Sequence, residues 1–442
     1  MMKITISSLW NYAIHLICLV LTYLFAQSLE PIWSYLILLI YSSWIFGRIA
    51  RNRVQIADLL VLLFIMLLAG QNFLLYAGLV LTLIYSISQM HKMKRLIFDR
   101  EEVAFLVMCL CGFLSSFFNS IDSKSANLYI GVYFLLLCLV LGLGFMRKCC
   151  KLDSDKSILI FSWVSFILGL GYFMTHTISE LFSTAHIFVY YISNYSVYSN
   201  TLTGIMAPFA FGSAIILIKT KEVLPRILSA LGLIMMSMII LAVQSRGTYL
   251  GILVAILWII AKNKKSKVVI WVTIIGIVCV FVSFFIPDEF FSMFFGRFRI
   301  SHFANRDFSN GRIESYVLAW DMFKSHPIIG CGFWQFSAYG INFGDPHNFI
   351  LAYLASTGLI GFGGFIFFLV SIYKRIERCY SQATDLYSKV LAEVSMSTLM
   401  IYCSHGLVEP SLTTSAPLTI FIIMTSMSYI NVNIREKSNL EG

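Results

Sequence analysis

The sequence predicts an all-α fold, that of a polytopic integral membrane protein with about 12 to 14 transmembrane helices. Of its 442 residues 59% are hydrophobic and only 12% are charged, with a mean hydropathy of +0.82. Soluble domains carry about 25% charged residues. Every second loop between the apolar runs is basic, as expected when successive loops lie on opposite sides of a membrane.

The apolar runs are numerous enough to place one membrane domain over residues 1–442. A spanning helix needs about 20 mostly apolar residues. Candidate spans lie near 9–29, 31–47, 56–71, 73–90, 103–119, 127–146, 157–178, 200–218, 227–243, 249–261, 268–286, 348–372, 390–407 and 416–432. The first span follows a short N-terminus with Lys3 and lacks a small-residue cleavage site, so we interpret it as a retained helix.

Lysine and arginine are distributed unevenly between the two sets of loops. The basic loops should be cytoplasmic, which places both termini inside. These loops face anionic lipid headgroups and account for most of the net charge of +10, so nucleic acid is not an expected partner. The outer side keeps seven of the 32 basic residues, namely Lys124, Arg246, Arg297, Arg299, Arg306, Arg312 and Lys324. Arginine binds phosphate with a planar fork, so this outer group suggests a bound anion.

Two outer loops are long. Residues 179–199 form the smaller one, and residues 287–347 form a large loop with structure of its own. Within the large loop, 311–325 predicts a helix, because Ile313, Tyr316, Val317, Trp320 and Phe323 recur at helical spacing. We expect this helix to lie in the membrane interface, with Trp320 at headgroup depth. Arg312 falls in its first turn, where unpaired N–H groups favour anions.

His347 is the strongest candidate for a catalytic residue. It follows Pro346 and precedes a long predicted span, whose positive N-terminal end disfavours imidazolium. A neutral imidazole can accept a proton from a sugar hydroxyl. The alternative is that His347 only caps the helix. Arg246 has the alternative of a lipid-phosphate anchor, and Arg312 that of a solvated helix face.

Cysteine and acidic residues give no indication of a cofactor. The ten cysteines form no even external set, and no C-x-x-C or His/Cys cluster is present. No Asp-x-Asp motif falls in an outer loop, so nothing indicates a divalent metal bridging a nucleotide sugar. We therefore predict a site without metal or cofactor.

Three outer-face motifs together resemble the O-antigen polymerase/ligase family. They are Ser245-Arg-Gly247, Asn310-Gly-Arg312 with Pro327-Ile-Ile-Gly-Cys-Gly332 after its helix, and His347-Asn348 leading into Gly358-Leu-Ile-Gly361. The resemblance covers about 240–365 by motif and the whole chain by topology. The resemblance rests on the order, the spacing and the common predicted outer location of the motifs.

The resemblance implies a membrane glycosyltransferase of surface polysaccharide or lipopolysaccharide biosynthesis in the bacterial inner membrane. The donor would be a glycan on undecaprenyl pyrophosphate at the periplasmic face. Arg246 and Arg312 would bind the pyrophosphate and His347 would be the general base. Supporting roles would fall to Arg297, Arg299, Arg306 and Asn348. Expected partners are the lipid-linked glycan, membrane lipid, a chain-length regulator and a flippase.

Several functions fit these motifs. A polymerase extends one lipid-linked chain with another, whereas a ligase moves the chain onto lipid A–core sugar. The span count and the loop at 179–199 favour the polymerase. From another class, a polysaccharide-lipid flippase or secondary transporter should keep ionisable residues near the midplane. The predicted spans are nearly free of charge, with Asp58 and Glu393 near inner ends. A scaffold for other assembly proteins is a third interpretation.

Overall fold

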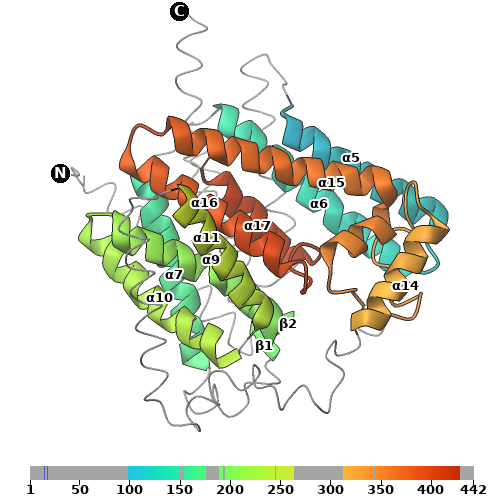
Figure 1. The fold of residues 1–442 in the computed structure, drawn as a ribbon, viewed down its shortest axis with the longest axis horizontal. Helices are drawn as coiled ribbons and strands as arrows, with labels where there is room; N and C mark the ends of the chain where they lie inside the picture. The colour runs from blue at the N-terminus through green and yellow to red at the C-terminus, as the bar shows by residue number, and fades with distance from the viewer. Residues whose placement is uncertain are drawn as a thin grey trace, which may run out of the picture.

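The computed structural model describes residues 98–149, 154–175, 189–192, 195–243, 245–262, 312–341 and 344–428, with Ile14 and Ile17. The regular secondary structure of these residues is helical apart from one short hairpin, which confirms the all-α class (Figure 1). The helices are α5 (Arg100–Asn119), α6 (Ser123–Cys149), α7 (Ser154–Thr175), α9 (Ser199–Lys219), α10 (Val223–Val243), α11 (Arg246–Lys262), α14 (Arg312–Ser325), α15 (Phe349–Gln382), α16 (Leu386–His405) and α17 (Ser415–Ser426).

Nine of the predicted spans correspond to helices in the described part of the chain, and five helices are long and apolar enough to cross a membrane. The predicted spans at 9–29, 31–47, 56–71, 73–90 and 268–286 lie outside the described residues. One predicted boundary was wrong. Helix α15 continues beyond residue 372 to Gln382. Arg375 stays helical there because it pairs with Asp99 and Glu101 at the start of α5.

The helices pack around a shared apolar core. Helix α15 runs beside α5, α16 contacts α9 and α11, and α17 lies between α16 and α6 (Figure 1). Glycines allow the backbones to approach closely, as is usual between membrane helices. A Cβ at Gly251 of α11 would lie 3.0 Å from the backbone of Ile401, and one at Gly364 would lie 2.9 Å from Ala104.

The described residues of the loop predicted at 179–199 contain a small antiparallel hairpin. Strands β1 (Val189–Ile192) and β2 (Tyr195–Tyr198) pair with Val189 opposite Tyr198. The second strand leads directly into α9 at Ser199. The hairpin therefore stands at the end of α9 from which Asn200 enters the site described below.

Helix α15 is interrupted at Gly358, whose φ is +64°. Residues 327–332 fill the gap in its hydrogen bonding. Cys331 N donates to Ala355 O at 2.8 Å, and Leu359 N donates to Pro327 O at 2.9 Å. A Cβ at Gly358 would lie 2.3 Å from Ile328 O, so only glycine fits. This interlock fixes the end of the large loop onto α15 and positions both α14 and His347.

The predicted helix at 311–325 forms α14, and its apolar stripe faces outward. Ile313, Val317 and Trp320 are 63%, 54% and 46% exposed, whereas Ala319 and Met322 are buried against the rest of the protein. A membrane interface would cover such a stripe. The interfacial location of α14 stays a prediction.

Candidate functional site

Residues 406–414, between α16 and α17, hold the starts of two other helices in place. Five polar contacts of this loop join it to segments far away in the sequence. The pairs are Gly406 O with Phe349 N at 2.9 Å, Leu407 O with Asn348 Nδ2 at 3.0 Å, Val408 O with Arg312 Nη1 at 2.7 Å, Leu412 O with Tyr353 Oη at 2.8 Å, and Asp345 Oδ2 with Thr413 Oγ1 at 2.7 Å. The loop therefore sets the relative position of α14 and α15.

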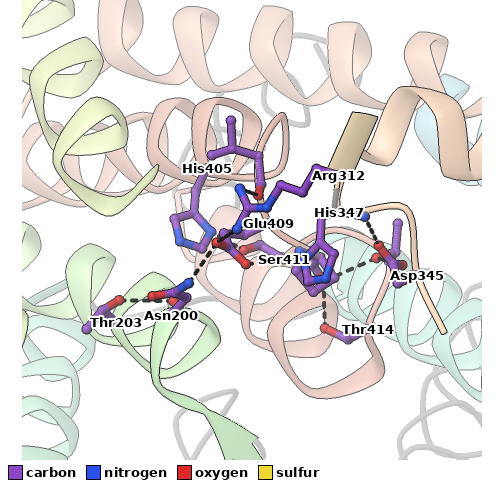
Figure 2. Close-up of polar contacts among 12 residues, drawn as sticks. Asn200, Thr203, Arg312, Asp345, His347, His405, Glu409, Ser411 and Thr414 are labelled. Carbon is purple, nitrogen blue, oxygen red and sulfur yellow. Dashed lines mark hydrogen bonds and ion pairs between the residues drawn. The ribbon is translucent and has the colours of Figure 1, made fainter. Parts of the chain in front are cut away.

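Glu409 lies at the centre of this loop and is almost completely buried. Its Oε1 accepts hydrogen bonds from Arg312 Nη2 at 2.6 Å and from Asn200 Nδ2 at 2.9 Å (Figure 2). Its Oε2 lies 3.4 Å from His347 Nδ1. Burial raises the pKa of Glu409, but the contact with His347 and the charge of Arg312 outweigh it and lower the pKa to about 2. Glu409 is therefore a carboxylate at neutral pH.

His347 has an unusual backbone conformation that is fixed by a buried acid. Its φ is +54°, which is uncommon for a residue other than glycine. The backbone N–H of His347 donates to Asp345 Oδ1 at 2.6 Å, and burial raises the pKa of Asp345 to about 6. The ring directs Nδ1 towards Glu409 (Figure 2). Nε2 is then on the opposite side of the ring from Glu409.

The alternative that His347 caps the following helix is wrong. Asn348 is the cap, because its Oδ1 accepts from Ile350 N at 3.0 Å and from Leu351 N at 3.1 Å. Its Nδ2 donates to Leu407 O. Asn348 thus has two structural hydrogen-bonding tasks, one in α15 and one in the 406–414 loop.

We expect Asn348→Ala to destabilise the protein without abolishing its chemistry. Loss of an asparagine cap costs about 0.5–2 kcal/mol. Asn348→Asp should retain most of the stability, because a carboxylate oxygen can still accept from the two N–H groups. Thermal unfolding of the purified variants in detergent measures this difference. Full stability of Asn348→Ala together with lost activity would instead place Asn348 against the substrate.

Arg246 begins α11 next to the same loop. A Cβ on the neighbouring Gly247 would lie 2.6 Å from Val408 Cγ2 and 3.6 Å from Glu409 Cγ. The side chain of Arg246 is exposed. Three segments therefore meet at the 406–414 loop. They are the start of α11, the start of α14 and the residue before the α15 cap. The other arginines proposed from the sequence, Arg297, Arg299 and Arg306, lie outside the described residues.

Sequence reasoning missed Glu409, Asn200 and His405. His405 is fully buried and forms a hydrogen bond through Nδ1 with Ser411 Oγ. A Cβ on Gly204 would lie 2.5 Å from its ring, so glycine there makes room for the imidazole. One signal pointed to Glu409. It is a carboxylate in a short outer loop between two apolar spans, where charge is costly unless it is paired.

Residues 231–366 match the family model described as O-antigen ligase. The match confirms the resemblance to the O-antigen polymerase/ligase family. No curated protein matches the chain. The matched segment contains Arg246, Arg312 and His347, and it ends before Glu409. It supports a membrane enzyme of the glycosyltransferase-like ligase or polymerase type.

Proposed function

We propose that the chain transfers an oligosaccharide from undecaprenyl pyrophosphate to an acceptor sugar hydroxyl at the periplasmic face, polymerising O-antigen or similar repeat units. The observation that carries this proposal is the meeting of three segments at the 406–414 loop, which brings Arg312 and His347 to the two oxygens of Glu409. Arg246 enters beside them through Gly247. Departure of a diphosphate requires cationic side chains, and removal of a proton requires a base such as imidazole. The site places these two kinds of group side by side.

The proposed reaction is a displacement at the anomeric carbon of the donor. The acceptor oxygen forms a bond to that carbon, and the bond from the carbon to the diphosphate oxygen breaks. The electron pair leaves with undecaprenyl diphosphate, whose charge Arg246 and Arg312 would stabilise. Nε2 of His347 would take the proton of the acceptor hydroxyl. Because arginine supplies the positive charge, the step has no requirement for a metal.

A site at the periplasmic face agrees with the direction of the helices. Lys219 pairs with Glu393 at 2.5 Å near the beginning of α16, and His405 ends that helix. The two positions are separated by about 18 Å of helix, at 1.5 Å per residue. Lys219 belongs to a loop that is cytoplasmic by the positive-inside rule. The end of α16 that carries the 406–414 loop would then face the periplasm.

A deletion strain complemented with single variants tests the proposal. A strain without this chain should attach single repeat units to the core and lose the ladder of longer chains on a gel. The wild-type chain should restore the ladder, and Arg246→Ala, Arg312→Ala and His347→Ala should not. Normal ladders from all three variants at normal protein levels would reject the proposed function.

The second candidate is the ligase, which the description of the matching family model favours. A ligase deletion should leave no repeat unit on the core while long lipid-linked chains accumulate. A flippase deletion should also leave the core bare, but the lipid-linked material should remain single repeat units on the cytoplasmic side. The band pattern and the state of the lipid-linked pool therefore separate the three functions.

A further inference from the structure

The polar groups of the site converge on a carboxylate that belongs to the protein. Arg312, Asn200 and His347 each direct a nitrogen towards Glu409, and they come from α14, α9 and the turn before α15. Such a convergence of donors on one acidic group is the arrangement of an anion-binding site. In Figure 2 the carboxylate of Glu409 lies between these side chains.

The guanidinium of Arg312 is engaged on both of its terminal nitrogens. Nη1 donates to Val408 O at 2.7 Å and Nη2 donates to Glu409 Oε1 at 2.6 Å. Both acceptors belong to the 406–414 loop. These two contacts use two of the five guanidinium N–H groups. A diphosphate that binds Arg312 through the same two N–H groups has to displace at least one acceptor of the loop.

The two members of the ion pair differ in exposure. The side chain of Arg312 is 26% exposed, and that of Glu409 is 6% exposed. An incoming anion can thus reach the arginine more easily than the carboxylate. Like charges a few ångström apart repel each other strongly when they are partly buried. We therefore expect that a diphosphate does not bind while Glu409 is paired with Arg312.

We propose that Glu409 is an internal occupant of the diphosphate site, which Arg312 exchanges for the donor diphosphate. The proposal rests on the proposed function and adds a role for a residue outside the matched family segment. Once Arg312 has moved to the donor, Glu409 retains Asn200 and His347 as partners. Glu409 is a positioning residue in this scheme, because it acts through Arg312 and His347.

The exchange couples donor binding to the contact between Glu409 and His347. A carboxylate released by Arg312 interacts more strongly with Nδ1–H of the imidazole and stabilises the imidazolium that forms when Nε2 accepts the acceptor proton. The proton stays on His347 during the transfer, and Glu409 remains ionised. Glu409 therefore interacts with His347 without competition from Arg312 only when a donor occupies the site.

Inorganic pyrophosphate titrated into the purified full chain in lipid nanodiscs tests this exchange. Glu409→Gln keeps the shape of the side chain and an acceptor for Asn200 but removes the competing charge. We expect it to bind pyrophosphate roughly five- to tenfold more tightly than the wild type. Its turnover with lipid-linked repeat units should fall roughly 10- to 100-fold, because the orienting carboxylate of His347 is lost.

A matched variant controls for the general effect of removing a buried carboxylate. Glu393 is fully buried and pairs with Lys219 near the other end of α16, so Glu393→Gln should leave pyrophosphate affinity unchanged. Arg312→Ala should weaken pyrophosphate binding in both the wild-type and the Glu409→Gln backgrounds. Thermal unfolding confirms that each variant is folded before it is titrated.

Tighter binding by Glu409→Gln that is lost in the Arg312→Ala background supports a competition between Glu409 and the diphosphate for Arg312. Unchanged or weaker binding by Glu409→Gln, or no binding by either protein, would overturn the inference. Failure of the proposed function is a separate result, namely normal ladders from all three of Arg246→Ala, Arg312→Ala and His347→Ala.

Discussion

Arg312→Ala is expected to slow glycan transfer by about 10²- to 10³-fold, the loss found when one group that stabilises developing negative charge is removed. The variant lacks the guanidinium that would stabilise the departing diphosphate. The measurement is the initial rate of chain extension by purified protein on saturating lipid-linked repeat units. The rate of Arg312→Lys should fall between those of the wild type and Arg312→Ala, because lysine keeps the charge and loses the planar fork.

Two controls separate this effect from a loss of folding. Arg312→Ala leaves the buried carboxylate of Glu409 without one of its cationic partners, so the variant should also unfold at lower temperature. Lys324→Ala removes an exposed cation from the other end of α14, and the rate should stay near that of the wild type. If folded Arg312→Ala kept a third or more of the wild-type rate, Arg312 would not bind the leaving group.

His347→Ala should reduce the rate by about 10²- to 10⁴-fold, the range for a general base. Pyrophosphate affinity should change little, because the imidazole acts on the acceptor. Position 347 needs a positive φ, which alanine tolerates poorly. Asparagine adopts this conformation more readily, so His347→Asn removes the base with less disturbance of the backbone.

The pair of variants at position 347 separates backbone effects from chemistry. Similar rate losses in His347→Asn and His347→Ala, with near-normal thermal stability for His347→Asn, would show that the imidazole itself is needed. A His347→Asn protein that elongates glycans at the wild-type rate would show that another group removes the proton.

Much of the fold was accessible from the sequence because hydropathy and charge are local properties. The apolar runs predicted α5, α9 and α15, and helical spacing predicted α14. The break in α15 was not predicted. Gly358 has a positive φ at the point where residues 327–332 return onto the helix. Contacts between segments so far apart leave no periodic signal in the sequence.

The candidate site, too, was predicted only in part from the sequence. Arg246, Arg312 and His347 could be proposed because basic residues are few on the predicted outer side and His347 precedes a long predicted span. Glu409 is more than sixty residues away from His347, and its importance follows from three contacts that appear only in the folded chain. The capping role fell to Asn348 because its short amide reaches the free N–H groups of α15.

An experimental structure of the chain with undecaprenyl diphosphate bound is the most direct test of the central claim. We expect phosphate oxygens about 3 Å from the guanidinium of Arg312 and close to Arg246, with Nε2 of His347 facing the position of the anomeric carbon. A diphosphate bound away from the 406–414 loop, or at the cytoplasmic ends of the helices, would contradict it.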